Sequence, residues 1–185
     1  MSPFAWVALS VGMIALLTIV IWSIRRHRDP ELHIQSDSPI DELMPSLAGL
    51  TLGTAVAGNT VEVFENGAFF DTLIERIAAA QRSVHFETFL WEHGVLGQRV
   101  ANALAERARA GRRVRVMLDA IGSKKVGEAT VRQLEEAGCK VAFFHKRTLL
   151  NIGVMTDRDH RKLVVIDGRE AFVGGHCIVD HWLGN

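Results

Sequence analysis

Two side chains suited to phosphodiester chemistry lie two positions apart near the end of the sequence, His160 and Lys162. Asp167 and the pair Gly174-Gly175 follow, so the whole pattern is H-x-K-x4-D-x6-G-G. Residues two apart on a β-strand point to the same face. An imidazole beside an ammonium group combines a nucleophile or proton carrier with positive charge for a phosphate. The spacing therefore predicts a site at His160 and Lys162 that attacks phosphodiesters.

The remaining positions of the motif have structural explanations of their own. Asp167-Gly168 is typical of a two-residue hairpin turn, and an aspartate there can accept bonds from nearby backbone amides. We therefore expect Asp167 to belong to the catalytic motif by holding its shape, without contacting substrate. At Gly174 and Gly175 the missing side chains would let backbone amides approach a phosphate. Close packing against a neighbouring strand would explain these glycines equally well.

Alternating strand and helix patterns from Gly58 onward predict the scaffold that positions the motif. The predicted strands are 60–64, 84–91, 114–118, 140–145, 160–166 and 170–173, and the predicted helices are 68–82, 98–110 and 127–137. This order favours an α/β fold, a mixed and mostly parallel sheet with helices on both faces. The loops at the carboxyl ends of such strands are the usual ligand site. The nearly continuous apolar run from Leu163 makes 160–166 a central, buried strand.

An uncharged apolar segment from Phe4 to Ile24 is long enough to cross a bilayer core of about 30 Å. Trp6 and Trp22 lie near its two ends, where indole rings favour the membrane interface, and the basic residues 25–28 follow at once. A cleaved secretory signal fits poorly because no basic region precedes the segment. Residues 1–28 are therefore predicted to form a single-pass transmembrane anchor with its basic flank on the cytoplasmic side.

Composition limits the other classes of function. The 21 basic and 21 acidic residues balance, which argues against a nucleic-acid partner. The two cysteines, Cys139 and Cys177, predict buried thiols and no disulfide framework. His176, Cys177 and His181 are clustered, but their spacing matches no standard zinc pattern, so we expect no metal and no cofactor. Residues 29–57 contain three prolines and no sustained period, which is typical of a linker.

The motif and its surroundings resemble the phospholipase D superfamily, and most closely the bacterial cardiolipin synthases. Besides the motif, the resemblance includes Glu87 within Phe86-Glu87-Thr88-Phe89, the segment Gly111–Ser123, and Arg158–Lys162. It covers residues 58–185 and looks like the first of two halves, each with its own motif. We therefore expect residues 58–185 to be a phospholipase D-like half, shortened at its C-terminal end, in a partial sequence of a two-motif enzyme.

The resemblance implies metal-independent phosphatidyl transfer in a bacterial inner membrane, with phosphatidylglycerol as the expected lipid. One histidine would attack the lipid phosphorus to give a phosphohistidine, and the histidine of a second motif would act as general acid and base. A phosphatidylglycerol hydroxyl would then accept the phosphatidyl group to yield cardiolipin. In this scheme His160 is the nucleophile or the acid–base partner and Lys162 binds the phosphate. Glu87 and Asp180 are candidates for the carboxylate that orients the histidine.

Two departures from the family pattern leave other functions open. Many members carry asparagine where this chain has Cys177, and the family builds its site from two motifs where this chain has one. A missing second half or a second copy would therefore have to complete the site. The alternatives are a homodimeric phosphodiesterase or nuclease and an inactive membrane-tethered fragment. The apolar loop residues Leu149, Leu150, Ile152, Val154 and Met155 would face either the bilayer or the core.

Overall fold

The computed structural model describes residues 2–26, 37–145 and 157–183. The chain divides into two compact units, Met1–Val61 and Glu62–Asn185.

The described residues of the first unit form two helices. Helix α1, Pro3–Arg26, includes the predicted anchor. Its stretch Pro3–Trp22 has a mean hydropathy of 2.5 and none of it is buried, so by length and composition it meets the requirements of a membrane span. Helix α2, Ile40–Thr51, lies inside the predicted linker 29–57, for which the sequence predicted no helix. Apolar residues at helical spacing and two acidic residues in the first turn, Asp41 and Glu42, account for it.

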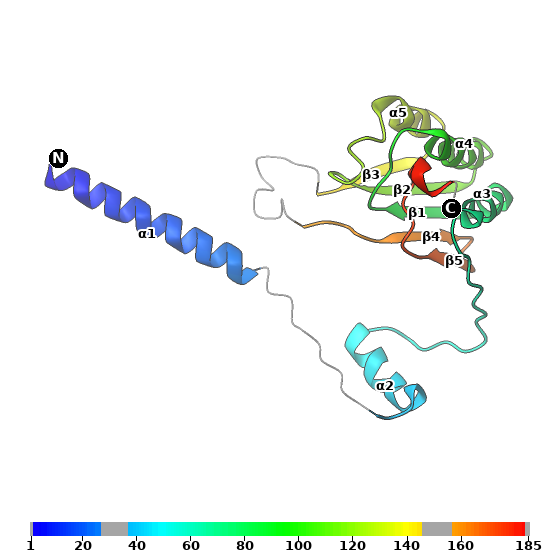
Figure 1. The fold of residues 1–185 in the computed structure, drawn as a ribbon, viewed down its shortest axis with the longest axis horizontal. Helices are drawn as coiled ribbons and strands as arrows, with labels where there is room; N and C mark the ends of the chain where they lie inside the picture. The colour runs from blue at the N-terminus through cyan, green and yellow to red at the C-terminus, as the bar shows by residue number, and fades with distance from the viewer. Residues whose placement is uncertain (1, 27–36, 146–156, 184–185) are drawn as a thin grey trace. The chain divides into compact units, whose positions relative to one another are not determined.

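The second unit is built on a five-stranded mixed sheet with the strand order β3-β2-β1-β4-β5. Its strands are β1 Ser83–Thr88, β2 Arg113–Asp119, β3 Lys140–Phe144, β4 Lys162–Ile166 and β5 Glu170–Val173. The pairings of β1 with β2 and of β2 with β3 are parallel, whereas β4 pairs antiparallel with both β1 and β5. Four strands thus run in one direction and β4 opposes them, which is the mixed, mostly parallel sheet that the sequence predicted (Figure 1).

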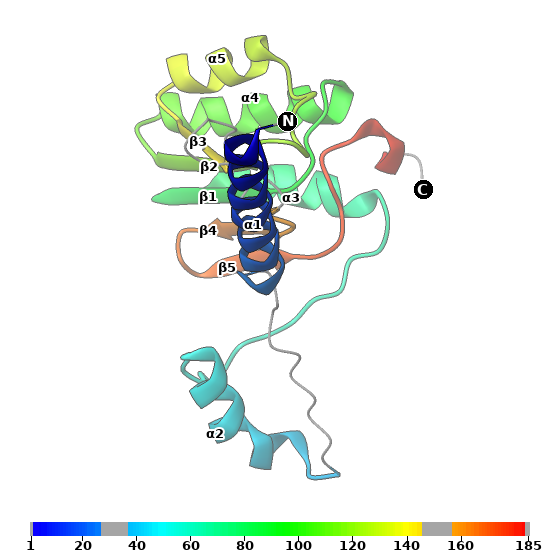
Figure 2. The same ribbon diagram turned by 90° about the vertical axis from the view of Figure 1, so that its left-hand side faces the viewer.

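Three helices cover one face of this sheet: α3 Ala68–Ala79, α4 Val95–Arg109 and α5 Glu128–Glu136. In Figures 1 and 2 the helices lie along the sheet in the order α5, α4, α3, which runs in the same direction as the strand order β3-β2-β1-β4-β5. The crossovers β1-α4-β2 and β2-α5-β3 step in the same direction, so right-handed connections bring both helices to the same face. The prediction of helices on both faces is therefore wrong for the described part of this unit.

The hydrophobic core lies between the sheet and these helices. The alternation along the strands shows it, since Val84, Phe86 and Val116 are buried while His85 and Glu87 are only partly so. The most completely buried large side chains include Trp91, Phe70, Leu73, Leu96 and Leu104. Apolar burial of this extent is the main source of the unit's stability.

Two predicted strands differ from the structure by more than one residue at one end, and a third is absent from it. Residues 60–64 form no strand; Val61 and Val63 are 89% and 80% exposed, and Phe64 instead packs its ring against Phe172. The strand predicted over 84–91 ends at Thr88, beyond which Trp91 forms a single bridge to Ile178. The strand predicted over 160–166 begins at Lys162, so His160 precedes it. Alternation alone cannot show where a partner strand ends.

Candidate active site

The motif begins at the end of the sheet where the parallel strands finish. Because β4 runs against β1, its first residue, Lys162, pairs with Thr88, the last residue of β1. His160 lies two residues earlier and is exposed. This is the carboxyl end of the parallel strands, where ligands usually bind in open α/β sheets.

The structure brings His160 and Lys162 into direct contact. The Lys162 ammonium donates to the His160 carbonyl oxygen at 2.7 Å. Its Nζ also lies 3.2 Å from Nδ1 of the His160 ring. Since an ammonium group only donates, Nδ1 acts as the acceptor in this contact. The pair that was expected to share the face of a strand is therefore assembled at the start of β4, with His160 in the extended segment before it.

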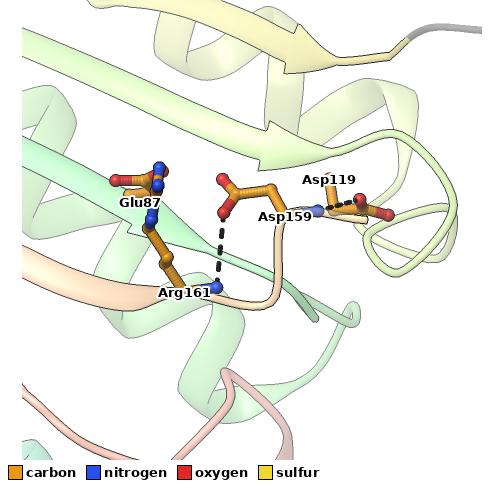
Figure 3. A network of polar contacts seen from close by, with 4 residues as sticks. All are labelled: Glu87, Asp119, Asp159 and Arg161. Atoms are coloured by element: carbon orange, nitrogen blue, oxygen red, sulfur yellow. Dashed lines mark hydrogen bonds and ion pairs between the residues drawn. The ribbon is translucent and has the colours of Figure 1, made fainter. Parts of the chain in front are cut away.

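A network of carboxylates holds the backbone on either side of His160 (Figure 3). Asp119, at the end of β2, is 1% exposed and accepts a bond from the Asp159 amide at 2.9 Å. The other oxygen of Asp119 accepts from the amides of Ile121 and Gly122 at 2.9 and 2.7 Å. Asp159 in turn accepts from the Arg161 amide at 3.3 Å. Residues 159 and 161 are thus tied to the sheet on both sides of the histidine.

Glu87 belongs to this network and faces Arg161. Its carboxylate accepts from the Arg161 guanidinium at 3.4 Å. Burial, and then the neighbouring Asp159 carboxylate, raise the pKa of Glu87, while Arg161 opposes this rise. One carboxylate oxygen of Asp159 is buried without a hydrogen-bond partner in the described residues, so a protonated Glu87 is a suitable donor for it. These contacts indicate that Glu87 helps to hold residues 159–161 at the start of the motif.

Asp167 lies at the opposite end of β4 from His160. Its carboxylate accepts three backbone amides at the start of β1: Gln81 at 2.9 Å, Arg82 at 2.7 Å and Ser83 at 2.8 Å. These bonds, that from Gln81 first, hold the pKa of Asp167 below its ordinary value. The carboxylate thus fixes the turn against β1 and lies away from the chemical pair.

The turn at Asp167 differs by one residue from the expected two-residue loop. Asp167 and Gly168 both have positive φ, as a type I′ turn requires, and the Arg169 amide closes it onto the Ile166 carbonyl at 3.0 Å. Arg169 is then an additional residue before β5, because Ile166 pairs with Glu170. The hairpin loop therefore contains three residues.

Gly174 and Gly175 follow β5 in open surroundings. A Cβ atom added at either position would meet no other described atom within 4 Å. Close packing within the described part of the chain therefore does not explain these glycines. The Gly174 amide donates weakly to the Lys162 carbonyl at 3.4 Å, which places the pair beside the start of β4.

Asp180 caps a helix. Its two carboxylate oxygens accept from the amides of Val95 and Leu96, each at 2.8 Å, at the start of α4. A Cβ on Gly94 would lie 2.5 Å from one of these oxygens, so the cap needs glycine there. A carboxylate bound to these amides also matches the positive end of the helix dipole.

The residues around Cys177 pack as an aromatic group. His176 stacks on Phe69 at 5.4 Å between ring centroids and meets Trp182 edge-on at 5.0 Å. Burial raises the pKa of the Cys177 thiol. Over residues 2–26, 37–145 and 157–183, no group of three or more His, Cys, Asp or Glu side chains is arranged to hold a metal ion.

The sequence patterns indicated no role for Asp119, Asp159 or Phe89. The Phe89 ring lies 4.5 Å from that of His160 and 5.3 Å from the Lys162 Nζ, measured to its centroid. The one available signal was an aspartate at a strand end followed by a glycine-containing loop, Asp119 to Ser123. The apolar loop residues considered for bilayer contact, 149–155, lie outside the described residues.

Comparison with known families gives one clear match. The family "Cardiolipin synthase, PLD-like domain" matches residues 73–179, which is more than half of the chain and includes the whole H-x-K-x4-D-x6-G-G motif.

Curated relatives carry the same description. A cardiolipin synthase of Oceanobacillus iheyensis is 35% identical over 128 residues, which are 68% of this chain and 26% of the relative. Cardiolipin synthase B of Salmonella typhimurium is 38% identical over 64% of this chain and 29% of its own length. A cardiolipin synthase of Geobacillus thermodenitrificans is 36% identical over 85% of this chain and 30% of its own length. The chain thus spans less than a third of these relatives.

Solved structures give weaker likenesses. NucT from Helicobacter pylori matches with a TM-score of 0.49 and 20% identity, over 62% of this chain and 70% of that one. Nuc from Salmonella typhimurium, a phospholipase D family member, matches with a TM-score of 0.47 and 14% identity, over 62% and 68% of the two chains.

Proposed function

Because this chain belongs to the cardiolipin synthase family with a phospholipase D-like domain, we propose that it contributes one motif to a phosphatidyl-transfer site. The observation that carries the proposal is the contact of the Lys162 ammonium with both the carbonyl oxygen and Nδ1 of His160. A cation fixed beside an imidazole can neutralise a phosphate that the ring attacks or protonates.

The proposed transfer proceeds in two displacements. In the first, an imidazole nitrogen forms a bond to the lipid phosphorus and the bond to the head-group oxygen breaks, while a general acid gives that oxygen a proton. In the second, a hydroxyl of another lipid loses its proton to the same group and displaces the imidazole. Phosphatidylglycerol as both donor and acceptor would give cardiolipin and glycerol.

The contact between the Lys162 ammonium and Nδ1 of His160 has to change when the substrate binds. Attack from Nε2 requires the proton of the neutral ring on Nδ1, whereas the present contact makes Nδ1 an acceptor. A phosphate oxygen that draws the ammonium away from Nδ1 would free this nitrogen to carry the proton. Both the nucleophilic and the acid–base role of His160 at Nε2 therefore require that Lys162 leave Nδ1 for the phosphate.

A second H-x-K-x4-D motif would complete the site in this proposal, from another stretch of polypeptide or from a second copy. The sequence contains one such motif, while a nucleophile and a general acid are both needed. The open surroundings of Gly174 and Gly175 beside β4 leave room for a phosphate to approach their backbone.

The membrane is the proposed setting of this reaction. Helix α1 is apolar over Pro3–Trp22, and we infer that it anchors the chain in the bacterial inner membrane as a single span. The basic residues 25–28 favour a cytoplasmic position for the catalytic unit. An anchor of this kind would keep the site near its lipid substrate.

A chimeric enzyme provides the test. Residues 58–185 would replace the matching segment of the Oceanobacillus iheyensis cardiolipin synthase, and the purified chimera would receive phosphatidylglycerol in vesicles or duplex DNA. We expect cardiolipin and glycerol from the lipid, no cleavage of the DNA, and loss of product in His160→Gln and Lys162→Met. Cardiolipin formation that survives His160→Gln would refute the role of this motif, and cleavage of DNA alone would favour a nuclease.

A further inference from the structure

Phe89 packs against both members of the proposed chemical pair. It follows Thr88, the last residue of β1. Its ring centroid lies 4.5 Å from that of His160, with the ring planes at 51°. The Lys162 Nζ lies 5.3 Å from the same centroid, within the range of a cation–π contact. One half-buried ring therefore restricts two side chains that would otherwise move freely at the surface.

The loop after β2 holds Phe89 from its other side. A Cβ on Gly122 would collide with the Phe89 carbonyl oxygen and would lie 2.9 Å from two ring carbons. Gly122 has no positive φ, so this close approach, and not its backbone conformation, calls for glycine. The fully buried Ser123 also donates from its hydroxyl to the Phe89 carbonyl at 3.0 Å.

Asp119 connects the two sides of this arrangement. It accepts the Gly122 amide at 2.7 Å, beneath Phe89, and the Asp159 amide at 2.9 Å, next to His160. The aromatic ring and the imidazole are thus positioned from the same buried carboxylate.

We propose that Phe89 is a positioning residue, whose ring holds His160 and Lys162 in the geometry in which both meet one phosphate. An aromatic face attracts an ammonium group without accepting a conventional hydrogen bond. The contact of the ammonium with Nδ1 is the one that a phosphate oxygen would replace, while the Phe89 ring and the His160 carbonyl oxygen keep the ammonium beside the imidazole. Holding both side chains in advance lowers the entropy lost when the phosphate binds. This inference rests on the proposed phosphatidyl transfer only for the identity of the ligand.

Nuclear magnetic resonance of the full chain in phosphatidylcholine nanodiscs, with isotope-labelled histidine, tests the positioning directly. The His160 signals are assigned by their loss in His160→Gln, and their three-bond couplings report whether χ1 is fixed or averaged. We expect a fixed χ1 in the wild-type chain and in Phe89→Tyr, and an averaged one in Phe89→Leu. Phe64→Leu, which truncates a half-buried ring packed on Phe172, is the matched control and should leave His160 unchanged.

Inorganic phosphate is the probe for the second readout. Its Kd, followed at the His160 signals, should rise about threefold to tenfold in Phe89→Leu and stay near the wild-type value in Phe89→Tyr. Gly122→Ala should also release χ1, because its methyl group displaces the Phe89 ring.

The two readouts separate this inference from the proposed function. A fixed His160 χ1 and an unchanged phosphate Kd in Phe89→Leu would overturn the positioning role. If χ1 depends on the ring while the chimeric cardiolipin synthase still forms cardiolipin with His160→Gln, positioning stands and the phosphatidyl-transfer proposal fails. Since Phe89→Tyr keeps the ring, a loss confined to Phe89→Leu comes from the missing ring, provided that the signals of the other labelled histidines in Phe89→Leu stay those of the folded chain.

Discussion

Asp119 and Asp167 do the same structural work at opposite ends of the sheet. Each carboxylate accepts three backbone amides, those of Ile121, Gly122 and Asp159 for Asp119, and those of residues 81–83 for Asp167. Asp167 belongs to the H-x-K-x4-D-x6-G-G pattern but lies at the end of β4 away from His160. Asp119 lies outside the motif, yet its bonds support the segment that carries His160.

The two carboxylates differ in burial. Asp119 is 1% exposed, whereas two of the three bonds to Asp167 are solvent-exposed. Water can replace a lost bond at Asp167 but not at Asp119, and an unpaired buried amide costs about 1–3 kcal/mol. A residue that belongs to the sequence motif, such as Asp167, can therefore lie far from His160 and stabilise the fold less than a residue outside the motif, such as Asp119.

Replacement of Asp119 should have the largest effect on the free energy of unfolding. Asp119→Ala leaves three amides without their acceptor and should lower the free energy of unfolding by about 3–5 kcal/mol. Chemical denaturation followed by circular dichroism measures this loss. Asp71→Ala, which removes an exposed carboxylate paired with Arg99, is the control and should cost less than about 1 kcal/mol. Equal losses in the two variants would break the comparison.

Replacement of Asp167 should have a smaller effect that depends on pH. Asp167→Ala should cost about 1–2 kcal/mol at pH 7, because water can reach its exposed amides. The folded-state pKa of Asp167 is lowered, so its contribution is present above the unfolded-state pKa of about 4 and is lost as the pH falls through the folded value. Denaturation at several pH values should show the difference from wild type shrinking below about pH 4. A difference that stays constant down to pH 2 would contradict this linkage.

Loss of the helix cap at Asp180 should have the third-largest effect on the free energy of unfolding. Asp180→Ala should lower the free energy of unfolding by about 1 kcal/mol, since Val95 and Leu96 lose their acceptor at the start of α4. Asp180→Asn, which keeps one acceptor oxygen, should recover part of it. The His160 signals should stay unchanged in both variants; a shift of these signals would instead support the orienting role expected from the sequence.

Replacement of Glu87 should have the smallest effect at neutral pH, within about 0.5 kcal/mol. The pKa of Glu87 is raised on folding, so the folded state becomes relatively less stable as the pH rises from the ordinary value of 4.5 through the raised one. Glu87→Gln should remove this decline and flatten the stability profile above pH 4.5. The same slope in Glu87→Gln and wild type would show that Glu87 is not its source.

The periodicities in the sequence predicted most elements of the second unit. Each described helix and strand of Glu62–Asn185 longer than three residues corresponds to a predicted one. The errors occur where a partner decides the outcome. Residues 60–64 have the alternation of a strand but pair with no described strand. The strand predicted over 84–91 was too long because its partner β4 begins opposite Thr88. The single-faced helix layer follows from the strand order, which no local pattern contains.

The sequence by itself determined which side chains are proposed for the chemistry of this protein. Residue type and spacing predicted His160 and Lys162 as the chemical pair, and the Asp167-Gly168 dipeptide predicted a turn, because these signals are local along one strand and its hairpin. Only the tertiary structure showed that Asp180 caps α4, that Glu87 contacts Arg161, and that Phe89 packs on the chemical pair. These contacts join residues tens of positions apart, and their partners depend on strand order and packing, which spacing along the chain does not record.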